Sequence, residues 1–503
     1  MSDYNKAADI AEKQLKFISP SMCYAKWAQS SIHLTNGMTS SCYHPPLHKI
    51  SISEIKNTPA ALHNTAEKKE ERRMMLQGQR PQGCEYCWKI EDANQRSDRI
   101  YRSGEGWAQN SRLEIFDALD RGDVVPRYLE LNFNQACNFK CMYCSPHLSN
   151  SWHNEINLNG PYKILDASGA ETFHNDTKYL ATQGLMPFNG KQEDNPYIDA
   201  FWKWWPEIYK KVEIIRITGG EPLMDVNTFK ILDYIYQHPN VSSMSITTNM
   251  CPPNPALFDK FIDKLKKLEQ IQIWNDPDRF NPGSGNHWYV NMALKNFELF
   301  VSLDAMGKQG EYIRPGLNIT TLKNNVQQYL ANTNNSILTF INTFNILSIP
   351  SIKEYLQYIL ELRIQYSKEA QGIKKIPIYD PYHKHPDYEI HPRQRIWFDL
   401  PLLRYPAWQS IECLPESFSS YLQEAIDFMK ANSDVENFTG FYDFEISKME
   451  RNLAILNNPK SSQLEINRKN FVLFFNQHDA RNGTDFRKLF PEFVELFNEW
   501  QLL

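Results

Sequence analysis

The chain has 503 residues, enough for two or three domains with their own cores, and its formal net charge is -5. A charge this small for the length argues against a dominant nucleic-acid-binding role. Aromatic residues make up 13% of the chain, which indicates a large globular protein and excludes a disordered one. The first residues are charged and lack a signal-peptide core, and no run of about 18 apolar residues occurs, so we expect a cytoplasmic protein without a membrane partner.

Nine cysteines mark the composition. Structural disulfides are rare in the cytosol, so clustered cysteines there indicate metal or redox chemistry. An N-terminal group of four, Cys23, Cys42, Cys84 and Cys87, lies before about Pro126, where short strands, turns and helices follow one another irregularly. Four thiolates suit either a tetrahedral zinc ion or a closed [4Fe–4S] cluster, and their spacing alone does not decide between the two.

From Tyr128 to Tyr379 short β-rich runs alternate with helical stretches. The predicted strands are Tyr128–Phe133, Val212–Ile217, Ser242–Thr247, Phe297–Ser302, Ile337–Asn342 and Ile376–Tyr379. The predicted helices are Asn227–Gln237, Ala256–Glu269, Thr320–Ala331 and Ile352–Tyr366. This alternation predicts an α/β fold of right-handed βαβ units, a partial (β/α)6 TIM-like barrel whose chemistry lies at the C-terminal ends of the strands.

Two long insertions, Ser149–Trp205 and Asn275–Leu294, interrupt the alternation, and loops of this length are usually functional or disordered. Three tryptophans near the end of the first insertion could line a cleft, but we expect them to anchor the insertion by packing; they are Trp202, Trp204 and Trp205. From about Leu414 the chain is predicted to be helical. One apolar face of a packed terminal helix is predicted from Phe486, Leu489, Phe490, Phe493, Leu496, Phe497 and Trp500.

A second cysteine group follows the first predicted strand of the alternation directly, as Cys137-x3-Cys141-x2-Cys144. Three thiolates on one loop can each bind one iron of a [4Fe–4S] cube, whereas a closed cluster takes four. The fourth iron then stays open, and an open metal position is where a ligand binds and reacts. A zinc site or incidental buried cysteines remain the alternative, which the position after a strand in a chain of βα units weakens.

This triplet resembles the cluster motif of the radical S-adenosylmethionine (SAM) superfamily. The resemblance implies that the open iron binds the amino and carboxylate groups of SAM and that Tyr143 lies against the adenine. It further implies that an electron from the cluster cleaves the sulfonium, giving methionine and a 5′-deoxyadenosyl radical that removes a hydrogen atom from the substrate. An electron donor such as flavodoxin or ferredoxin is then expected.

Three further segments are similar to that family. Thr218-Gly219-Gly220-Glu221-Pro222 follows the second strand and is expected beside the methionine amino group, where glycines allow close approach and carbonyls with a carboxylate suit an ammonium. Ser302 and Arg314 look like the pair that contacts the ribose and carboxylate, and Asn249 is expected to face the site. The resemblance covers about half of the chain, from Tyr128 to Tyr379.

The stretch from Cys23 to Cys42, which has Gly37 in the arrangement Cys-x13-Gly-x4-Cys, resembles the auxiliary-cluster motif of the SPASM and twitch subfamilies. With Cys84 and Cys87 it implies one additional [4Fe–4S] cluster of the twitch type, with zinc as the alternative. In those subfamilies this domain usually follows the barrel, whereas here it precedes it. Four protein ligands leave no open iron, so the cluster is expected to relay electrons or hold structure.

The remaining candidates have simpler explanations. Cys251 follows the third strand and could return a hydrogen atom to a substrate radical, although a small buried residue is the commoner case. His383 and His385 could bind metal but suit a solvated loop better, and Cys413 has no informative context.

We therefore expect an auxiliary-cluster domain at 1–126, a radical SAM partial barrel at 127–380 and a mostly helical domain at 381–503. The predicted function is hydrogen abstraction from a peptide or protein substrate. A dehydrogenase or epimerase acting on a small molecule such as a carbohydrate is the second hypothesis, and a non-catalytic iron–sulfur or zinc module is the third. A radical enzyme acting on nucleic acid would need a surface stripe of basic residues, which the composition does not indicate.

Overall fold

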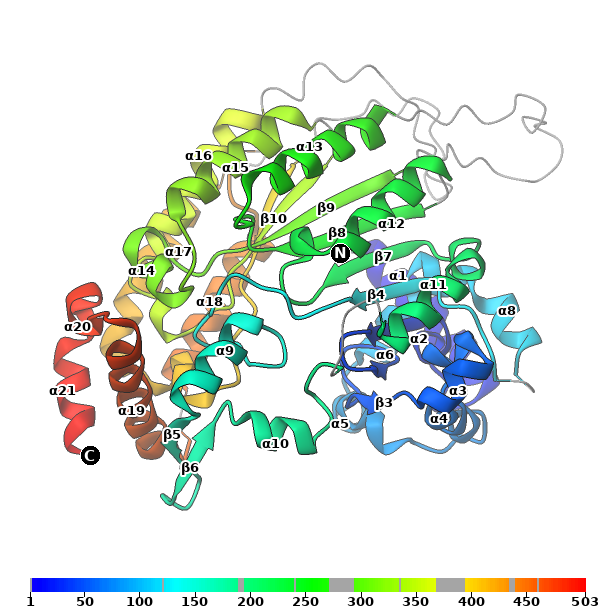
Figure 1. The fold of residues 1–503 in the computed structure, drawn as a ribbon, viewed down its shortest axis with the longest axis horizontal. Helices are drawn as coiled ribbons and strands as arrows, with labels where there is room; N and C mark the ends of the chain where they lie inside the picture. The colour runs from blue at the N-terminus through cyan, green and yellow to red at the C-terminus, as the bar shows by residue number, and fades with distance from the viewer. Residues whose placement is uncertain are drawn as a thin grey trace. The chain divides into compact units, whose positions relative to one another are not determined.

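A computed structural model of the chain describes residues 2–119, 122–188, 194–238, 241–270, 294–333, 336–367, 394–433, 439–458 and 461–503. The fold consists of two compact units, each assembled from separate stretches of sequence (Figure 1). The first unit comprises Met1–Gln135, Ala181–Ile246 and Met292–Lys295. The second comprises Ala136–Leu180, Thr247–Asn291 and Asn296–Leu503.

The first unit contains parallel strands that carry the predicted βα pattern. In the order of their pairing, the strands are β3 (His48–Lys49), β2 (Met38–Ser40), β1 (Gln29–His33), β4 (Tyr128–Asn132), β7 (Ile214–Thr218) and β8 (Val241–Thr248). β1, β4, β7 and β8 pair in parallel, with Ile32 beside Leu131 and Leu131 beside Ile217. These three side chains are at most 1% exposed, so one face of the strands is an apolar core.

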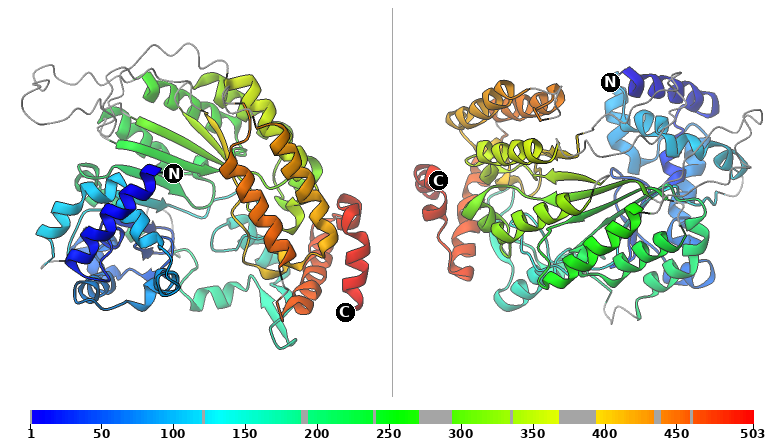
Figure 2. Two further views of the ribbon diagram at one scale, coloured as in Figure 1. Left: turned by 180° about the vertical axis from the view of Figure 1, so that it is seen from behind. Right: turned by 90° about the horizontal axis from the view of Figure 1, so that it is seen from above.

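Helices surround these strands and build a second core in the N-terminal region. They are α1 (Ser2–Ile18), α2 (Tyr24–Ala28), α3 (Ile52–Asn57), η1 (Pro59–Leu62), α4 (Ala66–Leu76), η2 (Gln82–Cys84), α5 (Glu85–Asp92), α6 (Asp98–Gly104), α7 (Gly106–Asn110), α8 (Arg112–Asp117), η4 (Pro222–Met224) and α12 (Val226–Gln237). Figure 2 shows the N-terminal helices, drawn in blue, gathered in one group, and all residues of α2 are buried. Trp27 and Tyr24 of α2 are both 0% exposed, because neighbouring helices cover the whole of this short helix.

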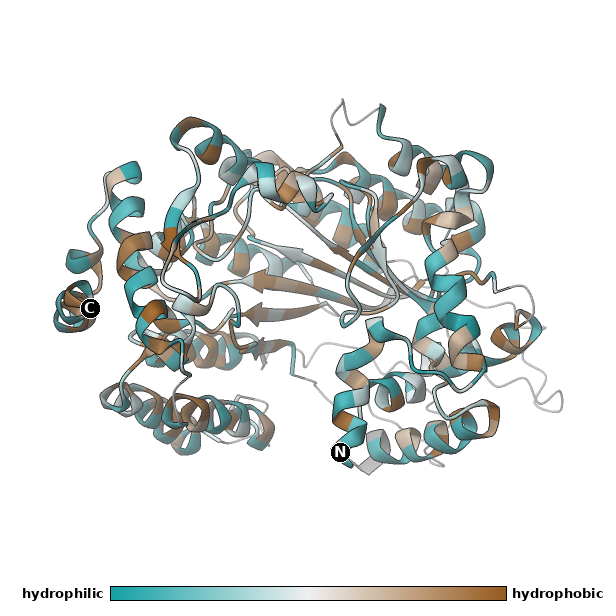
Figure 3. Cartoon of the chain, turned by 90° about the horizontal axis from the view of Figure 1, so that it is seen from below, coloured by the Kyte–Doolittle hydropathy of each residue, from teal (hydrophilic) through white to brown (hydrophobic). Residues whose placement is uncertain are grey.

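The second unit contains three parallel strands, β9 (Leu294–Ser302), β10 (Ile337–Ile341) and β11 (Ile396–Asp399), in that order. The helices that alternate with strands in this part of the chain are α13 (Pro255–Gln270), α14 (Gly307–Ile313), α15 (Ile319–Asn332) and α16 (Ile352–Ser367). Figure 3 shows hydrophobic residues concentrated on strands and recurring along the helices, as expected where one helical face is buried.

The insertion after the cysteine triplet is folded. It forms α9 (Asn150–Asn159), the antiparallel hairpin β5 (Tyr162–Leu165) and β6 (Glu171–His174), α10 (Thr177–Thr182) and α11 (Pro196–Tyr209). Trp204 and Trp205 on α11 are 3% and 1% exposed, which confirms that these tryptophans pack.

Helices dominate the C-terminal region as predicted. They are η6 (Ile346–Ser348), η8 (Ala407–Gln409), η9 (Ile411–Cys413), η10 (Glu416–Phe418), α17 (Ser419–Ala431), α18 (Asp443–Asn457), α19 (Leu464–Asn482), α20 (Phe486–Leu489), η11 (Pro491–Phe493) and α21 (Val494–Leu502). The predicted single terminal helix is wrong in one respect, because it is interrupted at η11. Pro491 lacks the N–H that a continuous helix needs there, so the apolar residues are spread over three short helices.

The predicted α/β class is confirmed, and the run of βα units is consistent with a partial barrel. Five of the six predicted strands and all four predicted helices coincide with observed elements to within a few residues. The sixth predicted strand, the insertion Asn275–Leu294 apart from its last residue, and both His383 and His385 lie outside the described residues. No helix in the described part of the chain has the length and apolarity to span a membrane.

Candidate functional site

The cysteine triplet lies on an irregular loop that follows β4. Its three thiols, on Cys137, Cys141 and Cys144, are partly exposed. Two apolar residues between them, Phe139 and Met142, are 1% and 0% exposed. Burial of these two side chains anchors the loop in the core, while the three cysteines stay partly exposed.

The first turn of α9 holds the carbonyl groups of this loop. Side-chain donors of the helix N-terminus reach three loop carbonyls, which a loop without neighbours would leave to water. These hydrogen bonds join Ser149 Oγ to Phe139 O (2.8 Å), Ser151 Oγ to Cys137 O (2.7 Å) and Trp152 Nε1 to Cys141 O (2.9 Å). The amide of Cys137 donates to Asn150 Oδ1 at 2.8 Å, so the same turn also fixes the start of the loop.

The segment after α14 holds the other edge of the loop. Two loop amides donate to the carbonyls of Ile313 and Pro315, each at 2.9 Å. Gly316 then passes so close that a Cβ atom placed on it would lie 2.6 Å from the carbonyl oxygen of Asn138. Its φ of 110° is also one that residues with a side chain rarely adopt. The close approach of the two backbones therefore requires glycine at this position.

A buried ion pair stands directly behind one thiol. Arg314 and Asp304 have side chains 6% and 0% exposed, and Arg314 Nε lies 2.7 Å from Asp304 Oδ2. Arg314 Nη1 lies 3.3 Å from the sulfur of Cys141. Tyr143 donates its hydroxyl hydrogen to Asp304 at 2.7 Å and accepts a hydrogen bond from Arg314. Burial would lower the pKa of Arg314, but Asp304, Tyr143 and Cys141 together outweigh it and hold the pKa well above its usual value, so a permanent positive charge faces the sulfur.

Asn138 connects the loop to the end of β8. Asn249 donates from Nδ2 to Asn138 Oδ1 at 2.9 Å, and Asn138 donates from Nδ2 to the carbonyl of Cys251 at 2.7 Å. The predicted site residue Asn249 thus positions the cysteine loop. The thiol of Cys251 is directed elsewhere, to the carbonyl oxygen of Asn318 at 3.8 Å, and the residue is 6% exposed.

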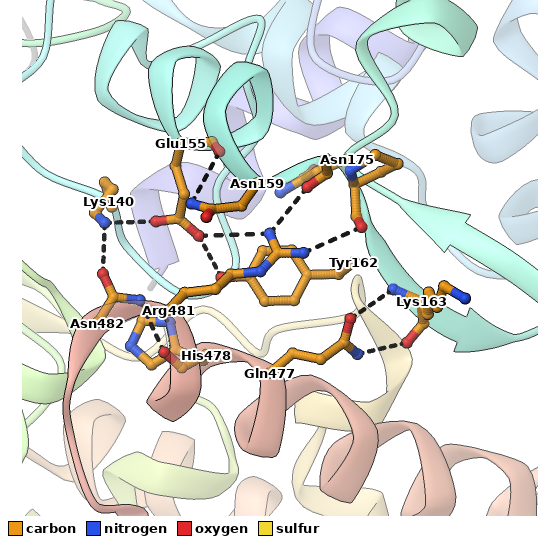
Figure 4. Close-up of polar contacts among 12 residues, drawn as sticks. Lys140, Glu155, Asn159, Tyr162, Lys163, Asn175, Gln477, His478, Arg481 and Asn482 are labelled. Atoms are coloured by element: carbon orange, nitrogen blue, oxygen red, sulfur yellow. Dashed lines mark hydrogen bonds and ion pairs between the residues drawn. The ribbon is translucent and has the colours of Figure 1, made fainter.

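The loop is also joined to α19 through a charged network (Figure 4). Lys140 pairs with the buried carboxylate of Glu155 on α9 and donates to Asn482 Oδ1 at 2.7 Å. Arg481 lies 3.8 Å from the same carboxylate and 3.8 Å above the ring of Tyr162, whose hydroxyl donates to Glu155. One carboxylate therefore serves two cations and a hydroxyl, and it connects the loop, the β5–β6 hairpin and a C-terminal helix within the second unit.

The N-terminal cysteine group converges on one cavity of the first unit. Its wall includes Cys23, Cys42, Cys84 and Cys87 together with Lys26. All nine cysteines of the chain are described, and none forms a disulfide. No three or more His, Cys, Asp or Glu side chains of the described ranges are grouped around a point suited to a single metal ion. A [4Fe–4S] cube binds each thiolate through a different iron, so its ligands need not converge on one point.

Burial governs the protonation of these thiols. It raises the pKa of Cys84 and of Cys87 to about 12 and that of Cys42 to about 11. In the triplet, burial raises the pKa of Cys144 to about 12 and also raises that of Cys141, with Arg314 acting in the opposite direction. These five thiols are therefore protonated at neutral pH without metal, and metal binding to them must release protons.

No protein-family model matches the chain. Among curated proteins it is 25% identical over 169 residues to the GTP 3′,8-cyclase of Trichodesmium erythraeum, which covers 32% of this chain and 40% of the relative. The GTP 3′,8-cyclase of Psychromonas ingrahamii is 27% identical over 159 residues, which is 31% of this chain and 35% of the relative. The chain thus matches well under half of the length of these radical SAM relatives. These similarities support the radical SAM superfamily.

A solved structure of Streptococcus suis SuiB bound to the precursor peptide SuiA is also similar to this chain. The match has 13% sequence identity and a TM-score of 0.28, and it covers 71% of this chain and 65% of that one.

The Gly-Gly-Glu segment belongs to the first unit. Gly219 has a φ of 119°, and a Cβ atom there would lie 2.5 Å from the side-chain oxygen of Asn132. The amide of Gly220 donates to the carbonyl of Asn134 at 3.2 Å. Glu221 is 1% exposed and its carboxylate accepts a hydrogen bond from the amide of Leu223. The glycines thus bring this turn onto the end of β4, while the contact with SAM stays a prediction.

The structure brings several predicted residues together around the loop, namely Cys141, Tyr143, Asn249 and Arg314. Ser302 is the last residue of β9 and pairs with Ile341. The roles of Ser302 and Arg314 toward SAM, and of Cys251 as hydrogen donor, stay predictions. Sequence analysis missed Asp304, Asn138 and Gly316, although Asp304 follows the recognised Ser302 by two residues. The sequence did offer one signal for the close approach to the backbone of Asn138, namely a glycine, Gly316, two positions after Arg314.

Replacing Gly316 by Ala should weaken cluster binding at the triplet. The added methyl group meets the backbone of Asn138 and the strained φ costs roughly 1–3 kcal/mol, so the loop must move. We expect iron at the triplet, about four atoms per chain, to fall after anaerobic reconstitution. Gly169→Ala is the matched control, since Gly169 has a φ of 84° with nothing within 4 Å. Equal iron in both variants would contradict the role of Gly316.

Replacing Glu155 by Gln should destabilise the second unit. Lys140 and Arg481, whose side chains are 23% and 12% exposed, would then face each other without a counterion. We expect a cost toward the lower end of roughly 3–5 kcal/mol, because both cations keep other hydrogen-bond acceptors. The measurement is the urea unfolding midpoint. Glu171→Gln removes a carboxylate from an exposed ion pair in the neighbouring β5–β6 hairpin and should cost about 0–1 kcal/mol; an equal loss in both variants would refute the prediction.

Proposed function

We propose that this chain reductively cleaves SAM and uses the resulting radical to remove a hydrogen atom from its substrate. The observation that carries the proposal is the triplet loop, which bears three partly exposed cysteines and whose backbone is held by the first turn of α9 and by the segment after α14. Three thiolates suit a [4Fe–4S] cluster with one open iron. When bound, such a cluster supplies the electron that splits SAM into methionine and a 5′-deoxyadenosyl radical.

Residues of the protein hold this site in place and favour the thiolate form of Cys141. Arg314 places a positive charge 3.3 Å from the sulfur of Cys141, which favours the thiolate over the thiol. The ion pair with Asp304 keeps that charge in place, and the hydrogen bond from Tyr143 fixes the carboxylate. Among the contacts that the structure describes, four hydrogen bonds use four of the five N–H donors of Arg314, which leaves one donor for the predicted contact with SAM.

We propose a second [4Fe–4S] cluster in the N-terminal cavity, bound by Cys23, Cys42, Cys84 and Cys87, with zinc as the alternative. The four cysteines line one cavity, which supports a shared group. Gly37 supports the likeness to the SPASM and twitch arrangement, because its φ of 66° and its contact with the ring of Tyr197 exclude a side chain there. A cluster with four thiolate ligands would relay electrons or hold structure.

The proposed substrate is a peptide or protein, on the likeness of the N-terminal cysteines to the SPASM and twitch subfamilies. A small-molecule substrate is the second candidate. The observation that favours it is the similarity to GTP 3′,8-cyclases, whose names specify a nucleotide. Flavodoxin or ferredoxin is the proposed source of the electron, and a cytoplasmic location stays a prediction.

The test of SAM cleavage needs no knowledge of the substrate. The chain is purified without oxygen, reconstituted with iron and sulfide, and mixed with dithionite and SAM, and 5′-deoxyadenosine is measured by chromatography. We expect product from the unaltered chain and none from Cys141→Ala, which loses one of three cluster ligands. Cys413→Ala serves as the control, since Cys413 belongs to neither cysteine group. An iron-loaded chain that forms no 5′-deoxyadenosine would favour a non-catalytic module.

Replacing Cys84 by Ala separates the two interpretations of the N-terminal site. If that site holds a second cluster, the variant should contain about four fewer irons per chain and should keep the triplet cluster. Metal content is measured by mass spectrometry after reconstitution. Unchanged iron with loss of about one zinc would identify a zinc site instead.

A further inference from the structure

The cavity of the N-terminal cysteines has a buried ammonium group in its wall. Lys26, on α2, is 2% exposed, and its Nζ lies 3.7 Å from the sulfur of Cys84. The same ammonium pairs with Glu71 on α4, whose side chain is 16% exposed. A lysine this deeply buried keeps its charge only with close anionic partners. Lys26 therefore lies next to Cys84, a proposed cluster ligand. Among the hydrogen bonds and ion pairs that the structure describes, Glu71 is its one carboxylate partner.

Two more basic side chains are buried in the same region of the first unit. Lys68 and Arg72 of α4 are 0% and 1% exposed. Lys68 donates to the hydroxyls of Ser30 and Thr39, at 3.2 and 2.8 Å, and these acceptors carry no charge. Arg72 likewise donates to neutral groups, the side chain of Asn64 and the carbonyls of Lys26 and Gly122. Burial lowers the pKa of Lys68 well below its usual value, and a neighbouring group with negative charge would favour the protonated form.

A cluster with four thiolate ligands has that property. An oxidised [4Fe–4S] cluster with four thiolates has a charge of about −2, and reduction by one electron makes it about −3. Hydrogen bonds to the sulfurs, nearby charge and burial set the potential of this step. A cation next to a ligand sulfur stabilises the reduced state more than the oxidised one, because the attraction grows with the charge on the cluster.

We propose that Lys26 is a positioning residue that raises the reduction potential of the N-terminal cluster, so that this cluster can accept one electron. The step adds one electron to the cluster and moves no proton. Glu71 opposes the effect, because its carboxylate partly neutralises the ammonium. This inference rests on the proposed second cluster in the same cavity.

The experiment isolates the N-terminal cluster in the full-length chain. Cys137, Cys141 and Cys144 are all replaced by Ala, the protein is reconstituted anaerobically, and dithionite in a mediated titration supplies the electrons. The ratio of reduced to oxidised cluster is read from absorbance and electron paramagnetic resonance at each potential. Lys26→Met, Glu71→Gln and Lys89→Met are compared in this background. Lys89 is the matched control, since it follows Cys87 by two residues but has a side chain 71% exposed.

Lys26→Met should lower the reduced-to-oxidised ratio at least tenfold at a fixed potential, which corresponds to about 59 mV for one electron. Glu71→Gln should shift the ratio in the opposite direction, and Lys89→Met should leave it unchanged because water screens an exposed charge. Equal potentials for the parent and Lys26→Met, both with four irons, would overturn the inference.

If Lys26→Met fails to assemble a cluster, Glu71→Gln decides, and an unchanged or lowered potential in that variant overturns the inference. Zinc in place of iron in the parent would overturn both the inference and the proposed second cluster. SAM cleavage by the unaltered chain is tested independently of both results, because it is measured as 5′-deoxyadenosine.

Discussion

The site depends on a loop whose backbone polar groups are satisfied by the surrounding protein. A loop of eight residues that carries three cysteines, Cys137 to Cys144, would ordinarily be mobile, because water competes for its amides and carbonyls. Here α9 supplies donors to its carbonyls and the segment at Ile313 and Pro315 accepts from its amides. These hydrogen bonds order the loop before any metal binds, so metal binding costs little further conformational entropy.

The two cysteine groups share one electrostatic arrangement, a buried cation next to a cysteine sulfur, although they lie in different units and differ in the number of cysteines. At the triplet, Arg314 is paired with Asp304 and lies 3.3 Å from a cysteine sulfur. In the N-terminal cavity, Lys26 is paired with Glu71 and lies 3.7 Å from Cys84. In each case a carboxylate holds a buried cation against a sulfur without cancelling it. The arginine offers a rigid fork that orders the loop, whereas the lysine offers a compact charge.

Patterns of local sequence predicted most of the fold, because apolar periodicity and strand length are local properties. The strands β4, β7, β8, β9 and β10 and their helices follow from such patterns. β1 was not predicted, because its residues Gln-Ser-Ser-Ile-His lack apolar alternation and become a strand by pairing with β4 and β2. The triplet could be predicted from its spacing, but the partners of Cys141 could not. Asp304 and Arg314 lie more than 160 residues away along the chain, and only folding brings them to the loop.

The account as a whole rests on one open iron at the triplet. Mössbauer spectroscopy of the unaltered chain, reconstituted with iron-57 under anaerobic conditions, measures this directly. We predict that one iron of the triplet cluster differs from the other three and that its isomer shift changes when SAM is added, because SAM becomes its ligand. Four equivalent irons with no response to SAM would contradict the account, since they would mean that the fourth position is already filled.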